Sequence, residues 1–134
     1  MKNAILLRLV GIAAIVVFLL HMTAMYLHLY WTIIWFDLVV HALGGLWVAL
    51  TLLWLVFHSN YERLHVFRGL GVFLVAIIGT LAVGIVWEFF ELATDTAVSP
   101  EIYRIDTALD LLMDTTGALI AYSFFIKIRD SHGA

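Results

Sequence analysis

The 134-residue chain contains no cysteine and only one proline, and only 13% of its residues are charged. Without cysteine there can be no disulfide and no thiolate metal ligand. The chain also has no glycine-rich phosphate loop, no serine–histidine nucleophile motif and no basic patch, so we expect no nucleic-acid partner. What it has instead is 64% hydrophobic residues and a mean hydropathy of +1.05. These values are typical of a membrane protein.

Four apolar runs are long enough to cross a bilayer, which takes about 20 residues. They cover roughly residues 9–30, 36–57, 69–92 and 107–126. Strands are excluded because the runs are long and do not alternate, and because an open sheet in lipid would leave backbone groups unpaired. The sequence therefore predicts an all-α fold, a polytopic membrane protein whose residues 1–134 form a single four-helix transmembrane bundle. It leaves open whether the bundle forms a homo-oligomer.

The basic residues predict how the bundle is oriented. With the N-terminus in the cytoplasm, the outer side holds only Arg104. The inner side holds all the others, which are Lys2, Arg8, Arg63, Arg68, Lys127 and Arg129. The positive-inside rule then places both termini in the cytoplasm, and we expect a multi-pass protein of a bacterial or archaeal cytoplasmic (inner) membrane.

A cleaved signal peptide is a rival interpretation of the first run. Lys2, Arg8 and the apolar residues 9–20 resemble the charged and apolar regions of such a peptide. The apolar and aromatic run continues to Trp35 without a break, however, which favours a membrane span.

Acidic residues gather in the outer halves of three expected spans, together with one histidine. Their spacings of three or four residues place each group on one helix face. The members of this carboxylate–histidine cluster are Asp37, His41, Glu88, Glu91, Asp106, Asp110 and Asp114. An ionised residue at the centre of a span costs about 2.5–3.5 kcal/mol. We therefore expect these faces to point toward each other and not toward lipid.

Once gathered, the six carboxylates repel each other. The candidate counter-charges are too few, namely His21, His28, His41 and Arg104. Either some carboxylates are protonated because they are desolvated, or a divalent cation lies among them, which is the simpler solution. Carboxylates with imidazole suit Zn, Mn or Fe, and carboxylates alone suit Mg, Ca or Mn. All seven cluster residues are candidate metal ligands, the best being Asp110, Asp114, Glu91 and His41.

Structural explanations also fit parts of the pattern. A helix-capping role explains Asp37 and Asp106, which are expected to begin the second and fourth spans. It does not explain Asp110 or Asp114, which lie inside a span. The Gly44–Gly45 pair and several other glycines are interpreted as sites of close helix approach, and Trp87 as a packing residue. His21 is either a packed histidine bonded to a neighbour or a part of the site.

Three stretches, "FDLVVHALGGL", "VWEFFEL" and "DTALDLLMDTTGALIA", together resemble the small bacterial integral membrane proteins of the YjdF kind. These proteins are similar in turn to the wider VanZ-like group, which is associated with glycopeptide-antibiotic resistance. The shared outline is D-x3-H-x2-G/G, then E-x2-E, then D-x3-D-x3-D-x2-GA, and it covers about residues 36–121. The resemblance implies a site at the same seven positions, and it implies no reaction.

The leading functional hypothesis is a divalent-metal site in the outer half of the bundle. A bound metal activates water and neutralises developing charge, so we expect metal-dependent hydrolysis or transfer on a membrane lipid or lipid-linked substrate. Glu88 or Glu91 is the candidate catalytic general base. One alternative is an ion or proton-coupled transporter. Another is a structural subunit whose polar cluster specifies helix packing.

Overall fold

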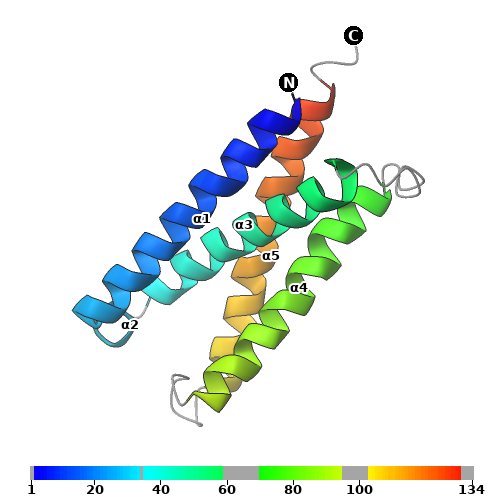
Figure 1. Ribbon diagram of the computed structural model, residues 1–134. Coiled ribbons are helices and arrows are strands. Elements are labelled where there is room, and N and C mark those ends of the chain that lie inside the picture. Colours follow the sequence, from blue (N-terminus) through cyan, green and yellow to red (C-terminus); the bar gives the residue numbers. More distant parts are fainter. Residues whose placement is uncertain (1, 34, 59–69, 95–102, 131–134) are drawn as a thin grey trace.

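The computed structural model describes residues 2–33, 35–58, 70–94 and 103–130. These residues form five helices and no strand (Figure 1). The helices are α1 (Lys2–Leu27), α2 (Leu29–Thr32), α3 (Phe36–His58), α4 (Leu70–Ala93) and α5 (Tyr103–Asp130). All but the short α2 are long and apolar enough to cross a membrane. The predicted all-α fold with four spans is confirmed.

Helix α3 lies at the centre of the bundle. Its most extensive contact is with α5, while α1 packs on α3, and α4 packs on both α3 and α5. Within the described residues, the backbones of α1 and α4 do not approach each other closely, and Figure 1 shows the two helices on opposite flanks of α3. The N- and C-terminal ends of the chain lie at the same end of the bundle. This arrangement agrees with both termini being on one side of a membrane, and which side that is stays a prediction.

Two helices, α1 and α5, differ from the expected spans at both of their ends. The first long helix ends at Leu27 because His28 adopts a left-handed backbone conformation, with φ of 55°. The one-turn helix α2 then occupies part of the expected loop at residues 31–35. Hydropathy did not mark this break because the aromatic run continues across it. The last helix is longer than the expected 107–126, because acidic residues in a first turn and basic residues in a last turn stabilise helix ends.

The two ends of the bundle differ in chemistry. The end that holds the chain termini contains an apolar core, made of Leu6, Ala49, Leu50, Leu53, Val72, Ala76, Ala118, Ala121 and Phe125. The end that holds α2, called the α2 end below, contains the buried charged residues. Arg63 and Arg68, on which part of the orientation argument rests, lie outside the described residues.

Two glycines bring the backbones of α3 and α5 into contact. A Cβ atom at Gly45 would run into the backbone oxygen of Asp114, and one at Gly117 would run into the carbonyl oxygen of Ala42. The predicted role of glycine in close helix approach is therefore confirmed at Gly45. At Gly44 nothing lies within 4 Å of a Cβ position. The close crossing places the acidic face of α5 directly beside the start of α3.

Candidate metal centre

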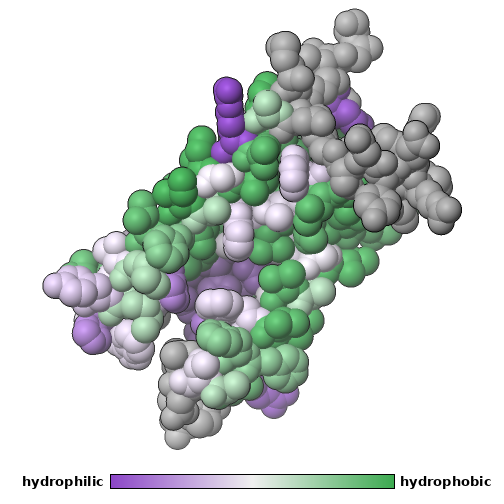
Figure 2. Space-filling model, viewed as in Figure 1, coloured by the Kyte–Doolittle hydropathy of each residue, from purple (hydrophilic) through white to green (hydrophobic). Residues whose placement is uncertain are grey.

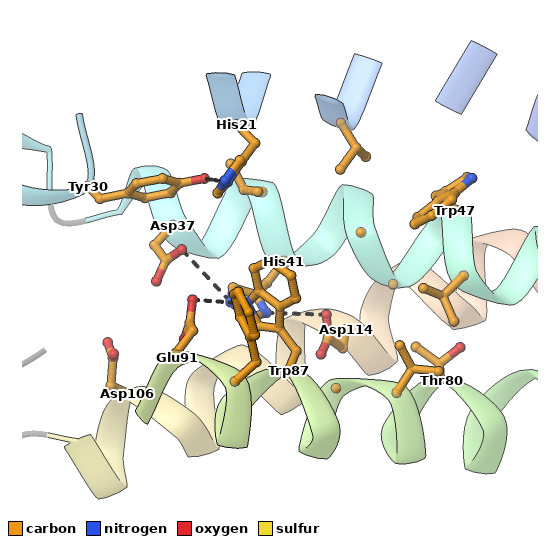
Figure 3. Close-up of a pocket in the computed structure, with 18 of the residues that line it drawn as sticks. His21, Tyr30, Asp37, His41, Trp47, Thr80, Trp87, Glu91, Asp106 and Asp114 are labelled. Atoms are coloured by element: carbon orange, nitrogen blue, oxygen red, sulfur yellow. Dashed lines mark hydrogen bonds and ion pairs between the residues drawn. The ribbon is translucent and has the colours of Figure 1, made fainter. Parts of the chain in front are cut away.

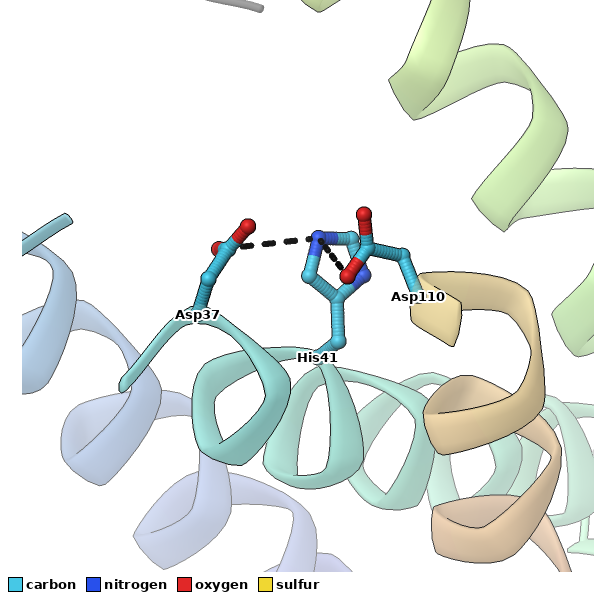
Figure 4. A group of neighbouring side chains, drawn as sticks. All are labelled: Asp37, His41 and Asp110. Atoms are coloured by element: carbon cyan, nitrogen blue, oxygen red, sulfur yellow. Dashed lines mark ion pairs between the residues drawn. The ribbon is translucent and has the colours of Figure 1, made fainter. Parts of the chain in front are cut away.

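His41 on α3 is the centre of the polar cluster, and its side chain is 7% exposed. Its Nδ1 atom is 3.3 Å from Oδ1 of Asp114, within hydrogen-bonding distance. Its Nε2 atom is 3.8 Å from Oδ1 of Asp37 and 3.9 Å from Oδ1 of Asp110 (Figure 4). Both nitrogens of one imidazole therefore face carboxylates, one from its own helix and two from α5.

Two sets of possible ligand atoms share His41. The first is formed by Asp37, His41 and Asp110, and the second by His41, Glu88 and Glu91. Within each set the ligand atoms lie within 4.8 Å of one another. Asp114 and Asp106 belong to neither set, although both line the same cavity. The first set joins α3 to α5, and the second joins α3 to α4.

Two carboxylate oxygens in the cluster are buried without a hydrogen-bond partner among the described residues. They are Oδ1 of Asp110, a residue only 1% exposed, and Oε1 of Glu88, a residue 5% exposed. The other oxygen of Glu88 accepts a 2.6 Å hydrogen bond from the hydroxyl of Thr107 on α5. A buried polar atom without a partner costs about 1–3 kcal/mol, so such atoms often indicate an ion or a water.

A second network lies nearer the mouth of the site (Figure 3). Trp87 donates its indole N–H to Oε1 of Glu91 at 2.9 Å. The His21 ring meets Trp87 edge-on, with ring centroids 6.2 Å apart, and its Nδ1 is 2.8 Å from the hydroxyl of Tyr30. Side chains from α1, α2 and α4 are thereby linked around the cluster. His21 is hydrogen-bonded to a neighbour, as one of its two interpretations expected, and Trp87 makes a hydrogen bond in addition to its packing contacts.

Tyr30 belongs to α2, outside the four membrane-spanning segments. Burial raises the pKa of its phenol above the ordinary value of 10.0, and the negative charges of Asp37 and Glu91 raise it further. The hydroxyl therefore stays protonated at neutral pH, so it can donate its hydrogen to the His21 ring.

The cluster forms part of the lining of a cavity of about 410 Å³. Its polar lining includes Asp37, His41, Glu91, Asp106 and Asp114. Gly84 on α4 also lines it, and a Cβ atom at Gly84 would run into the carboxylate of Asp114. Because Gly84 has no side chain, the Asp114 carboxylate can lie against the backbone of α4. Figure 2 shows this region as a hollow with hydrophilic residues between two apolar flanks.

The seven residues predicted from the sequence all lie at the α2 end, five of them in the two possible ligand sets. The capping interpretation of Asp106 is wrong, because α5 begins at Tyr103 and Asp106 lies inside its first turn. Asp37 likewise lies inside the first turn of α3, next to His41. The sequence analysis missed Thr107 and Tyr30, whose contacts join distant parts of the chain without any local motif.

The fold and the site together define a class: a four-helix membrane protein with a buried carboxylate–histidine centre at one end. The chain belongs to a family described as predicted membrane protein (DUF2238), whose sequence pattern matches residues 3–131. No curated protein and no solved structure gives a significant match to the chain. The family description agrees with the four spans and states no reaction.

Proposed function

We propose that the carboxylate–histidine cluster binds a divalent metal ion between Asp37, His41 and Asp110. The separation of these side chains carries the proposal. The distances of 3.8 and 3.9 Å from Nε2 to the two carboxylates exceed the 2.7–3.2 Å of a typical N–H···O hydrogen bond. Two ligand atoms at about 2.1 Å from a tetrahedral metal lie about 3.4 Å apart. The gap between Nε2 of His41 and the carboxylates of Asp37 and Asp110 is thus too wide for hydrogen bonds. The side chains need to move only slightly closer together to hold an ion.

The other side of the imidazole supports the same proposal. The Asp114 carboxylate at Nδ1 fixes the ring so that Nε2 faces the gap, an arrangement common around metal-bound histidines. In this arrangement Asp114 orients the ligand and does not itself contact the metal. An ion in the gap would also satisfy Oδ1 of Asp110, which is buried without a hydrogen-bond partner in the described structure. The ligand chemistry favours Zn, Mn or Fe, and Mg or Ca would rely on the carboxylates.

We further propose that the bound ion serves a hydrolase or transferase that acts on a membrane lipid or lipid-linked substrate. An ion held by Asp37, His41 and Asp110 would lower the pKa of a bound water and stabilise the charge that develops on the attacked group. Glu91 lines the cavity and lies near His41, so it is placed to take the proton from that water and return it to the leaving group. Glu88, held by Thr107, is the second candidate base.

The resemblance of these positions to YjdF-like and VanZ-like proteins agrees with a shared site. On the orientation predicted from the basic residues, this site opens toward the outer leaflet of a bacterial or archaeal cytoplasmic membrane. Among the described residues, the opposite end of the bundle is filled by the apolar core, and for that reason we favour chemistry at one leaflet over ion transport.

Element-resolved metal analysis of the purified full-length protein tests the proposal. We expect about one divalent ion per chain, and we expect Asp110→Asn to lose it. Asp130→Asn makes the same chemical change at the other end of α5 and should retain the ion. The proposal fails if the wild-type protein, loaded with each candidate metal in turn, holds no stoichiometric ion. It fails equally if Asp110→Asn and Asp130→Asn retain the same amount.

A further inference from the structure

The cavity beside the candidate metal centre is open on the side that would face lipid. Its walls come mainly from α1, α3 and α4. In the described residues the backbones of α1 and α4 do not approach each other closely, and the rings of His21 and Trp87 meet across the gap between these helices. The residues that line the cavity at this opening are apolar and exposed, as Met25 at 39%, Val83 at 45% and Phe90 at 52% show. In Figure 2 the hydrophilic residues lie at the bottom of the hollow. A cavity with an apolar rim and a polar floor suits an amphiphile.

Polar atoms without partners lie along the cavity or beside it. Oδ1 of Asp110 and Oε1 of Glu88 belong to the cluster. The hydroxyl of Thr80, eight residues deeper on α4, is also buried without a partner in the described structure, and Thr80 is 1% exposed. Other threonines donate a hydrogen bond within their own helix; the hydroxyl of Thr115, for example, donates to the carbonyl oxygen of Leu111 at 2.8 Å. Thr80 therefore offers a hydrogen bond to a ligand that reaches past the cluster.

The charge of the cavity limits which ligand it can take. No lysine or arginine in the described chain lines the cavity, and Arg104, near the start of α5, is exposed to solvent. Counted as ionised, the six carboxylates of the cluster carry more negative charge than one divalent ion neutralises. An anionic group placed there would meet like charges, which strongly disfavours binding.

We propose that the cavity takes a membrane lipid sideways from the bilayer, between α1 and α4, and that this lipid carries no net negative charge. Its head group would bear hydroxyl or amino groups, which can donate hydrogen bonds to the buried carboxylate oxygens. The hydroxyl of Thr80 would bind an uncharged oxygen further along the same molecule. The inference deepens the proposed function, and its charge argument rests on the single ion proposed above. It excludes polyprenyl phosphates and other anionic lipids as the preferred substrate.

Native mass spectrometry of the full-length, metal-loaded protein tests this selectivity. The probes are diacylglycerol, phosphatidylethanolamine and phosphatidylglycerol with identical acyl chains, each offered at the same concentration. We expect the two lipids without net charge to bind about a hundredfold more tightly than phosphatidylglycerol, because like charges are costly in a desolvated site. Equal or stronger binding of phosphatidylglycerol would overturn the proposal.

A matched pair of valines on α4 tests the sideways opening. Val83 lines the cavity and is 45% exposed, whereas Val86 is 67% exposed and does not line it. Val83→Trp should fill the opening and lower lipid binding about tenfold, and Val86→Trp should bind lipid as the wild type does. Met25→Trp would fill the opening from the α1 side, and it replaces Val83→Trp in the experiment if that variant does not fold. Equal binding by Val83→Trp and the wild type, or an equal loss in both valine variants, would overturn the proposal.

Metal content measured on the same samples separates the two proposals. Wild-type protein that holds its ion but binds all lipids alike would refute the lipid selectivity and leave the metal site intact. Wild-type protein that holds no ion but still selects uncharged lipids would refute the metal site and support the selectivity.

Discussion

A single methyl group at Gly45 should push apart the two helices that form the candidate metal centre. A Cβ atom at this position would meet the backbone oxygen of Asp114 and lie 2.6 Å from its Cα atom. Because these are backbone atoms, no side chain can rotate out of the way. Carbon atoms in contact are normally about 3.5–4.0 Å apart, so α5 must move away from α3 by about 1 Å.

This displacement is large on the scale of the site. Functional groups in a binding site must be held to within about 0.5 Å, and the gap between Nε2 of His41 and Oδ1 of Asp110 is 3.9 Å. We expect Gly45→Ala to weaken metal binding by about tenfold to a hundredfold, as is typical when ligand support is disturbed. Overpacking at the helix crossing should also lower the free energy of unfolding by about 1–3 kcal/mol.

Gly44→Ala is the matched control, because it adds the same methyl group one residue earlier, where nothing lies within 4 Å. Metal affinity is measured by competition with a chromophoric chelator in detergent micelles, and stability by thermal unfolding followed by circular dichroism. Gly44→Ala should behave as the wild type in both assays. If Gly45→Ala also binds metal and unfolds like the wild type, the close contact of α3 and α5 does not hold the site together, and the reasoning is refuted.

Three further predictions concern residues around the cluster. Thr107→Val removes the hydroxyl that donates to Glu88 and should lower the free energy of unfolding by about 1–3 kcal/mol, because a buried carboxylate oxygen loses its partner. Thr107→Ser should unfold like the wild type, and an unchanged thermal unfolding curve for Thr107→Val would contradict this role. Trp87→Phe removes the N–H donated to Glu91 and should lower the free energy of unfolding by about 1 kcal/mol; an unchanged thermal unfolding curve would contradict it. The pKa of the Tyr30 phenol is raised in the folded protein. This group should therefore leave the free energy of unfolding unchanged below about pH 10 and lower it as the pH rises further. Tyr30→Phe should reduce that alkaline loss of stability, and the same dependence of unfolding on pH in the variant and the wild type would argue against the raised pKa.

The spans and the depth of the polar residues could be predicted from the sequence. In lipid a backbone must satisfy its own hydrogen bonds, so a long apolar run has few alternatives to a helix. The cost of a charge in lipid then requires the acidic faces to meet. The three aspartates at every fourth position of α5 and the Asp37–His41 pair on α3 accordingly lie together at one end.

The partners of each side chain could not be predicted. Periodicity gives the face of a helix that is polar, but it does not give the rotation and crossing of that helix against its neighbours. From the sequence, Asp110 and Asp114 were both predicted as metal ligands. In the structure Asp110 faces Nε2 of His41, whereas Asp114 faces Nδ1. The break at His28 was hidden for a different reason, since a single left-handed residue leaves no mark on hydropathy.

The close pairing of α3 with α5 has a consequence for how the protein is made. The two helices are separated in the chain by α4, so α5, which carries Asp110 and Asp114, emerges from the ribosome after α3 and α4. The last span is also the least hydrophobic of the four, with a mean hydropathy of 1.4 against 2.0 for α3 and 2.5 for α1 and α4. Its aspartates are better accommodated beside a helix already in the bilayer than in lipid alone. The polar face of α3 is thus a favourable partner for α5 as α5 enters the membrane.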